Sequence, residues 1–289
     1  MINKLILGTA QFGFNYGINN STGKVSKHEA FKILDYAYKN NIRTIDTAES
    51  YGNSQQILGM YLAANPTKKF KIITKIDINK NYEKTHLIDS IISSKELLNI
   101  NFFEGYMFHD YKFFKDSEYL FSKLEKAKEM GLLKTLGISL YNNNEIEDII
   151  QNYNFDFIQI PFNLLDNSSK RKSILIMAKE RNIDVHVRSV FLQGLFFKSK
   201  EIMPTKLKPL IKYINDLEEI CLERNISIDE LAIKYNYSKS YIDKIIFGVD
   251  NLNQLKRNIE IMKSNILIPN KTIDKINVLE NELLNPSNW

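Results

Sequence analysis

Five polar side chains stand at or near the ends of short apolar runs, where they could do chemistry. They are Asp46, Lys75, His109, Ser139 and Gln159. A carboxylate, an ammonium and an imidazole are groups used in proton transfer and in covalent catalysis. Each of them alone is commonly a cap, a turn former or a solvated side chain. Their importance therefore depends on whether the fold brings them together.

The runs that carry these residues belong to a regular alternation of β-rich and helical stretches, which is typical of a parallel sheet. Eight such units with no Ser/Gly-rich or Pro-rich linker favour a closed α/β (β/α)8 barrel, a TIM barrel, over a doubly wound open sheet. We expect one domain over residues 1–289. In a barrel the carboxyl ends of the strands share one rim, so the five side chains should converge there. The expected strands are residues 4–8, 44–46, 71–75, 103–109, 133–139, 157–161, 184–189 and 244–248.

The helical stretches carry residues typical of helix starts and ends. Ser26 and Glu29 have the spacing of a capping box, and an apolar stripe follows them. Two segments interrupt the simple alternation: an extra helix is expected near residues 210–223, after the seventh strand, and Pro269 introduces a C-terminal helix ending near Pro286. The stripe consists of Ala30, Ile33, Leu34, Ala37 and Tyr38.

Composition indicates a globular chain with a core large enough to be stable alone. Hydrophobic residues make up 44% of the 289 residues and charged residues 25%. The 39 Lys+Arg and 34 Asp+Glu give a net charge of +5 without a long basic run, so no nucleic-acid partner is expected. The single cysteine, Cys221, excludes an internal disulfide and suits a reducing compartment. With neither a signal peptide nor an 18-residue apolar stretch, we expect a cytoplasmic protein without a membrane partner.

The segment after the second expected strand resembles the signature of the aldo-keto reductases. It reads Ile-Asp-Thr-Ala-Glu-Ser-Tyr-Gly over residues 45–52, so Tyr51 follows Asp46 by five residues. Lys75 and His109 fall where that family keeps its other two catalytic residues. Further matches occur in the same order at residues 7–13, 136–139, 191–195 and 246–248, and at Asn258. The resemblance implies NADP(H)-dependent reduction of an aldehyde or ketone.

The chemistry of Asp46, Tyr51, Lys75 and His109 agrees with carbonyl reduction. Hydride reduction of a carbonyl leaves an alkoxide that must be protonated, and a phenol with a pKa near 10 is a poor donor unless its proton is loosened. We expect Lys75 to lower the pKa of Tyr51 and Asp46 to hold Lys75. His109 would donate or orient a hydrogen bond at the carbonyl oxygen.

Hydride chemistry needs a carrier, and the sequence shows neither a nucleophilic triad nor a metal-ligand cluster, so a nicotinamide is expected and no metal. A Gly-rich dinucleotide fingerprint is absent, which argues against a Rossmann domain. It does not argue against a family that binds the dinucleotide across the barrel mouth. The resemblance implies that Ser139 and Gln159 hold the carboxamide. It places the pyrophosphate along Ser189, Phe191, Gln193 and Gly194, a phosphate near Gly248, and the adenosine near Gln254 and Asn258.

Two positions depart from the family pattern. Where many members place an aromatic ring against the nicotinamide, this chain has Arg188, whose planar guanidinium we expect to stack there. Where many members grip the 2′-phosphate of NADP with Lys and Arg, this chain has Gly248 and then Gln254, with Lys256 and Arg257 nearby. NADP(H) is therefore implied by the resemblance only, and NAD(H) stays open.

Two other functions remain open at this stage. The chain could be a relative that binds the cofactor as a weakly catalytic regulatory subunit, or a Schiff-base lyase or aldolase in which Lys75 attacks the carbonyl. The substrate is expected to be a small carbonyl compound chosen by the loops at residues 15–24, 110–114 and 195–206. The opening residues 11–17 resemble bacterial members linked with carbohydrate metabolism, which points to a sugar-derived carbonyl. The oligomeric state is open.

Overall fold

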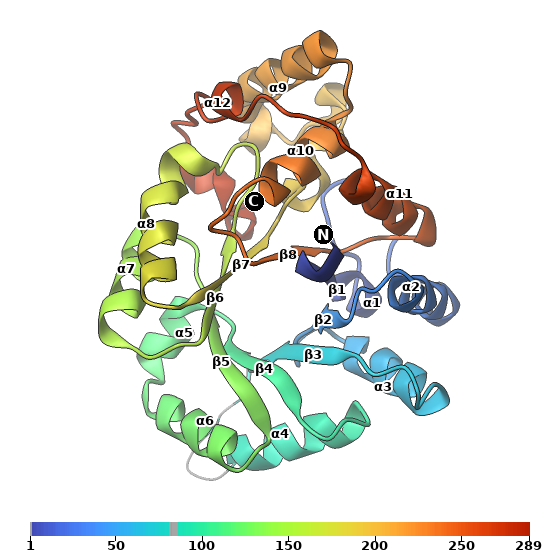
Figure 1. Cartoon of the computed structure of the whole chain (residues 1–289), viewed down its shortest axis with the longest axis vertical. Helices are drawn as coiled ribbons and strands as arrows, with labels where there is room; N and C mark the ends of the chain where they lie inside the picture. Colours follow the sequence, from blue (N-terminus) through green and yellow to red (C-terminus); the bar gives the residue numbers. More distant parts are fainter. Residues whose placement is uncertain (1, 81, 83–85) are drawn as a thin grey trace.

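The computed structural model describes residues 2–80, 82 and 86–289; residue 1, where the expected single domain begins, and residues 81 and 83–85 lie outside the described residues. Eight parallel strands close into a barrel in sequential order, and helices surround it (Figure 1). The predicted (β/α)8 barrel is confirmed. Its strands are β1 (Leu5–Gly8), β2 (Thr44–Asp46), β3 (Lys71–Lys75), β4 (Phe103–Phe108), β5 (Leu133–Ser139), β6 (Phe157–Pro161), β7 (Asp184–Arg188) and β8 (Lys244–Phe247).

The predicted strand boundaries agree with the structure to within one residue. Lys4 belongs to a short 3₁₀ helix, Ile2–Lys4, and not to β1. At the other end of their strands, His109, Ser189 and Gly248 each follow the last strand residue. These three residues therefore open the loops at the rim.

The inside of the barrel holds a small apolar cluster that is separate from the main core. Side chains alternate between the two faces of a strand, so a residue two positions further along returns to the same side. This period places the polar rim directly above the apolar layer. The cluster is Ile6, Ile73, Met107, Phe157 and Ile246, and two positions on stand Gly8, Lys75, His109, Gln159 and Gly248. On the other three strands, Thr44, Gly137 and His186 lead in the same way to Asp46, Ser139 and Arg188.

His186 lies in this interior, where its ring stacks on that of Phe157 with centroids 4.6 Å apart. The side chain of Phe157 has room because β5 carries Gly137 beside it; a Cβ there would lie 2.2 Å from the ring. Burial lowers the pKa of His186 to about 3, and the charge of Lys244 adds to this effect. The imidazole is therefore neutral in the folded protein at neutral pH.

This neutral histidine should make stability depend on pH. Between the ordinary histidine pKa of 6.5 and about 3, the unfolded chain binds a proton at His186 that the folded chain does not. Stability is therefore lost as the pH falls, by about 1.4 kcal/mol per pH unit from this residue. The free energy of unfolding can be measured by denaturant titration at several pH values from neutral to acid. The slope of this free energy against pH should be shallower in His186→Gln than in the wild type. Equal slopes would contradict a neutral, buried His186.

Helices cover the outside of the barrel and enclose the main core. In the first long helix the predicted stripe is buried at Ala30, Ile33, Leu34 and Ala37, while Tyr38 is half-buried. The helices are α1 (Ala10–Gly13), α2 (Lys27–Lys39), α3 (Ser54–Ala64), α4 (His86–Leu97), α5 (Tyr111–Asp116), α6 (Tyr119–Glu129), α7 (Asn143–Asn152), α8 (Ser168–Glu180), α9 (Ile211–Arg224), α10 (Ile228–Tyr237), α11 (Leu252–Lys263) and α12 (Asn270–Ile273).

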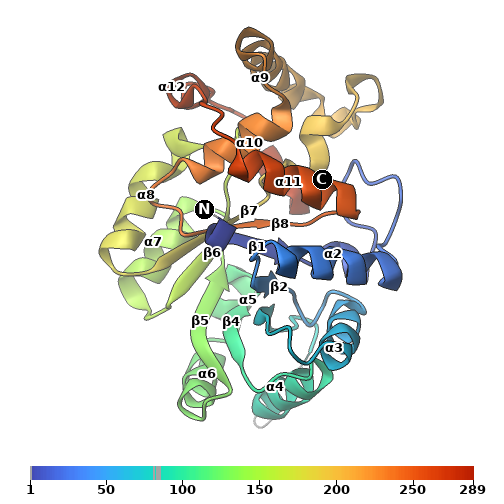
Figure 2. The same cartoon turned by 45° about the vertical axis from the view of Figure 1, so that its right-hand side comes forward.

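The capping box predicted for α2 forms on one side only. The Ser26 hydroxyl accepts a hydrogen bond from the Glu29 backbone N–H at 3.2 Å. The Glu29 carboxylate does not return to Ser26, because it accepts instead from the backbone N–H of Leu252 at 2.8 Å. That bond ties α2 to the start of α11, which lies beside α2 (Figures 1 and 2).

The extra helix after the seventh strand is confirmed as α9, but the long C-terminal helix is not. The chain after Pro269 forms only the four residues of α12 and then irregular structure with short 3₁₀ turns. The physical reason is tertiary: the Asn167 side chain donates to the carbonyls of Ile273 and Ile276, at 3.0 and 2.9 Å, so they are satisfied without a helix. Within the described residues, no helix is long and apolar enough to cross a membrane.

Candidate active site

A buried ion pair lies at the rim where β2 and β3 end. The Lys75 ammonium donates to the Asp46 carboxylate at 2.5 Å and to the backbone carbonyl of Thr47 at 3.1 Å. The second carboxylate oxygen of Asp46 accepts from the Gln159 amide at 2.8 Å. Both charged residues are less than 5% exposed. The pair therefore joins three strands, and both charges are partnered.

Tyr51 lies in the loop between β2 and α3, next to this pair. The Lys75 nitrogen lies 5.0 Å from the centre of the Tyr51 ring. The ring also makes edge contacts with Phe14 and His109, at centroid distances of 5.7 and 5.8 Å. The structure thus brings the predicted set of four together at one place on the rim.

Two glycines let the N-terminal segment pack against the backbone of this loop. Gly52 has φ +48°, a conformation in which a side chain is strained. A Cβ on Gly13 would lie 2.0 Å from the carbonyl oxygen of Tyr51. The tyrosine loop therefore rests directly on the residues that follow β1.

We expect Gly13→Ala to displace Tyr51, because the added methyl group meets backbone that must move. The loss of stability should be roughly 1–3 kcal/mol, with a larger relative loss of turnover. Gly59→Ala is the matched control: its Cβ would lie 1.9 Å from the Leu97 carbonyl oxygen, away from the site. Both variants should melt earlier, and only Gly13→Ala should lose turnover at temperatures where both are folded. Equal turnover would show that the close approach at Gly13 does not position Tyr51.

Glu49 anchors the same loop from the outside of the barrel. Its side chain is 3% exposed and forms an ion pair with Lys80 at 2.9 Å. The hydroxyls of Tyr106, Tyr82 and Ser90 also donate to it, the latter two at 3.3 Å. Tyr51 is therefore held between Gly13 on one side and the Glu49 anchor on the other.

The electrostatic surroundings of Tyr51 differ from the sequence expectation. Burial raises the pKa of Tyr51, the charge of Asp46 raises it further, and Arg188 is the cation that lowers it. Lys75 was expected to lower this pKa. Its charge is instead balanced at short range by Asp46, and burial lowers the pKa of Lys75 itself. The Tyr51 phenol is therefore protonated at neutral pH.

His109 is held neutral beside Tyr51. Burial lowers the pKa of His109 to about 3, with further lowering by the charges of Lys75 and Arg188. Its Nδ1 lies 3.3 Å from the Ser50 hydroxyl. A neutral imidazole always retains one N–H, so His109 can serve as a hydrogen-bond donor without carrying charge.

A cavity of ≈ 720 Å³ opens on the rim and runs outward to α11. Eleven of the residues predicted for the site line it, and Lys75, His109 and Ser139 contact Asp46, Tyr51 and Arg188 among them. A cavity of this size suits a small-molecule ligand or cofactor. The eleven are Asp46, Tyr51, Gln159, Arg188, Ser189, Phe191, Gln193, Gly194, Gly248, Gln254 and Asn258.

Arg188 stacks on an aromatic ring of the chain itself. Its guanidinium carbon lies 4.3 Å from the centre of the Tyr141 ring. The same group donates to the hydroxyls of Ser139 and Ser189, both at 3.4 Å. Arg188 is therefore fixed at the cavity wall with one face of its plane covered.

The loop after β7 holds its backbone in an unusual conformation along the cavity. Ser189, Leu192, Gln193 and Gly194 all have positive φ, from 47° to 86°. Such strain in residues other than glycine is concentrated at functional sites. Across the cavity, a Cβ on Gly248 would lie 2.2 Å from the Gln11 side chain. Because Gly248 has no Cβ, the Gln11 side chain can pack against its backbone at the cavity wall.

Several residues of the site were not predicted from the sequence. Gln11 and Tyr16 line the cavity but were noted only as part of a resembling stretch, and Tyr141 stands two positions after Ser139 without a motif. Glu49 lies inside the signature, yet nothing in its spacing indicates burial. Asp250 also lines the cavity. An acidic residue after a strand is too common a signal to single out.

The sequence and the fold match those of known proteins. The model of the aldo/keto reductase family matches residues 4–280. An oxidoreductase of Bacillus subtilis, YqkF, is 21% identical, over 88% of this chain and 89% of that protein. A D-threo-aldose 1-dehydrogenase of a Pseudomonas species is 22% identical, over 88% and 90%. The structure of an aldo-keto reductase from Bacillus halodurans, in its holo form, superimposes with a TM-score of 0.78 at 20% identity, covering 95% of this chain and 92% of that one.

The family model identifies the family where the barrel alone would not, because barrels of many unrelated activities share that fold. The chain therefore belongs to the aldo/keto reductase family and is an NAD(P)H-dependent oxidoreductase that acts on a small carbonyl compound.

Proposed function

We propose that this chain reduces an aldehyde or ketone to the alcohol and that Tyr51 donates the proton. The observation that carries the proposal is the grouping at one end of the cavity. There a protonated phenol, Tyr51, stands beside a buried ammonium, Lys75, and a neutral imidazole, His109. A substrate carbonyl at the cavity wall would meet the phenol directly.

Protonation of the product is the step that Tyr51 would perform. A phenol that stays protonated at neutral pH is a competent acid toward an alkoxide, which is a stronger base than a phenolate. The phenolate formed in this step would be stabilised by two cations. Arg188 already lowers the pKa of Tyr51, and Lys75 lies 5.0 Å from its ring. Asp46 would hold Lys75 in place while the negative charge appears.

His109 would orient the carbonyl oxygen. Because its pKa is about 3, it would offer an N–H without adding positive charge near Tyr51. The Ser50 hydroxyl at 3.3 Å would hold the ring. We assign Tyr51 the proton transfer and His109 the orientation.

The rest of the cavity suits an extended nicotinamide dinucleotide. A bound nicotinamide supplies the hydride. Gln159 donates one amide N–H to Asp46, so its second N–H and its carbonyl oxygen would remain for a carboxamide, next to Ser139. Arg188 has one face on Tyr141, and we propose that its other face stacks on the nicotinamide. The loop of Ser189, Phe191, Gln193 and Gly194 would follow the pyrophosphate, with Gly248 opposite and Gln254 and Asn258 at the adenosine end.

A sugar-derived carbonyl is the substrate class that we propose. One relative is named a D-threo-aldose 1-dehydrogenase, and Gln11, Tyr16 and Gly17 of the opening residues 11–17 line the cavity. Tyr16 is half-buried there, and desolvation of its phenol raises its pKa to about 12. Hydroxyl and amide groups along this wall can hydrogen-bond a polyol.

A panel of aldehydes, keto-sugars and nucleotide-linked keto-sugars, each tested with NADH and NADPH, would test this function. We expect oxidation of the reduced cofactor that depends on the carbonyl compound. Cofactor binding without turnover on any of them would favour the regulatory-subunit alternative. The Schiff-base alternative has less support, because Lys75 is 2% exposed and is paired with Asp46.

A further inference from the structure

The end of the cavity farthest from Tyr51 lies against α11 and the loop that precedes it. If the nicotinamide lies beside Tyr51, as proposed above, the adenosine ribose lies at this end. The inference below rests on that placement. Its lining residues include Asp229, Asp250, Asn253, Gln254, Arg257 and Asn258.

One carboxylate here is fixed by its neighbours. Asp250 follows β8, and its two oxygens accept hydrogen bonds from the side-chain amides of Asn20 at 3.3 Å and Gln254 at 3.2 Å. Its backbone N–H donates in turn to Gln254 at 2.7 Å. The carboxylate of Asp250 therefore stays at the cavity wall.

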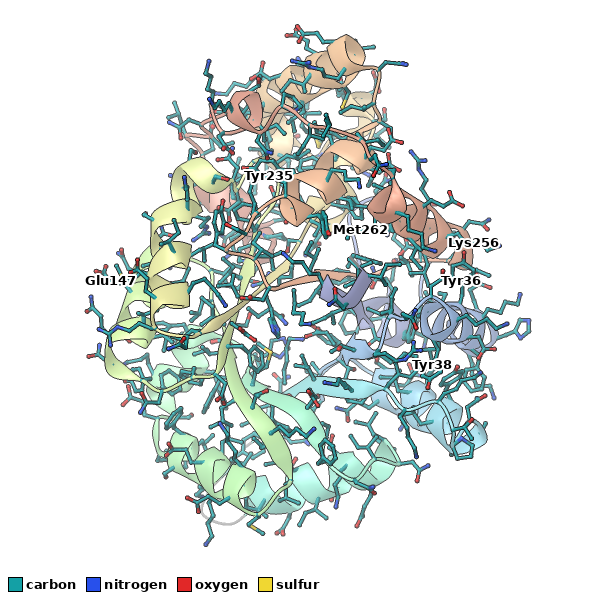
Figure 3. The ribbon with its side chains drawn as sticks, viewed as in Figure 1. Tyr36, Tyr38, Glu147, Tyr235, Lys256 and Met262 are labelled. Carbon is teal, nitrogen blue, oxygen red and sulfur yellow. The ribbon has the colours of Figure 1, made fainter. Side chains whose placement is uncertain are left out.

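Two basic residues of α11, Arg257 and Lys256, are engaged by neighbouring helices. Arg257 donates to Asp229 at 2.9 Å and to Glu230 at 2.8 Å, both in the first turn of α10. Lys256 lies over the ring of Tyr36 on α2, with 5.8 Å between its nitrogen and the ring centre (Figure 3). Among the described residues that line the cavity, the other cation is Arg188, at the Tyr51 end.

We propose that this end of the cavity selects an adenosine ribose without a 2′-phosphate, so that the chain binds NAD(H) more tightly than NADP(H). A carboxylate accepts hydrogen bonds from ribose hydroxyls, as the acidic residue of other NAD sites does. A 2′-phosphate brings close to two negative charges toward Asp250 and Asp229. The charge of Arg257, the cation that lines this end of the cavity among the described residues, is already balanced by Asp229 and Glu230. This chain therefore differs from the NADP(H) use that its family resemblance implies.

Binding measured without turnover tests this inference. NADH and NADPH are titrated into the full chain and followed by nicotinamide fluorescence, and AMP and adenosine 2′,5′-bisphosphate are titrated by calorimetry. We expect NADH to bind roughly tenfold or more tightly than NADPH. We also expect AMP to bind more tightly than adenosine 2′,5′-bisphosphate. Asp250→Ser should reduce the ratio of the NADPH dissociation constant to the NADH dissociation constant. Asp229→Asn, which frees one contact of Arg257, should reduce this ratio too. Asp216→Asn on α9, outside the cavity, is the matched control and should leave the ratio unchanged.

Equal or tighter binding of NADPH by the wild type would overturn the inference, and so would a ratio unaffected by both variants. An active enzyme that prefers NADPH would leave the proposed function intact. Failure of both dinucleotides to bind would overturn the function together with the inference.

Discussion

Tyr51→Phe should reduce carbonyl reduction by about 10²–10⁴-fold and leave cofactor affinity unchanged. The substitution removes one hydroxyl and keeps the ring, so the edge contacts with Phe14 and His109 remain. The lost group is the one that would protonate the alkoxide, and water is a less well placed donor. Initial rates with an aldehyde, together with fluorescence titration of the cofactor, would separate the two effects.

Tyr36→Phe is the matched control for this experiment. Tyr36 lies on α2, outside the residues that line the cavity, and its ring packs near Lys256. It should retain the wild-type rate. If Tyr51→Phe retained the rate as well, the proton would come from another group and the assignment of Tyr51 would be wrong.

The second large effect is expected for Lys75→Met, which leaves the Asp46 carboxylate buried without its cation. Removing one partner of a buried pair typically costs about 3–5 kcal/mol, and Asp46 is only 4% exposed. Turnover should fall as well, because the ammonium beside the Tyr51 ring is lost. Lys71→Met is the control at the other end of the same strand. The Lys71 side chain is 56% exposed and Glu104 keeps a second ion pair with Lys134, so the expected cost is below about 1 kcal/mol.

The double variant Asp46→Asn/Lys75→Met separates stability from chemistry. With both charges removed, most of the stability lost in Lys75→Met should return, because no buried charge remains unpaired. Turnover should not return. Denaturant unfolding and initial rates on the same preparations measure both properties. Recovery of turnover in the double variant would show that the pair acts only on folding.

The strands could be predicted because each is a short apolar run with a fixed period. Residues 71–75 and 157–161, for example, agree with β3 and β6 at both ends. The same period explains the site. Lys75 stands two positions after Ile73, and Gln159 two after Phe157, so the residues of the inner apolar cluster indicate which side chains lie at the rim above them.

What the sequence could not indicate depends on contacts between distant segments. The long C-terminal helix was wrong because Asn167, more than a hundred residues earlier, takes the carbonyls that the helix would have used. The cation that lowers the pKa of Tyr51 in the resting site is Arg188, from β7, while the charge of Lys75 is balanced by Asp46. The engagement of Arg257 by α10 likewise has no signal in local spacing.

The most direct test of the central claim follows the transferred hydrogen. The chain is incubated with glyceraldehyde and a reduced nicotinamide cofactor that is deuterated at its transferable position, and the product is analysed by mass spectrometry. We predict an alcohol with one deuterium on the former carbonyl carbon, and a strongly reduced yield in Tyr51→Phe. An unlabelled product, or substrate trapped on Lys75 by borohydride, would contradict carbonyl reduction by this site.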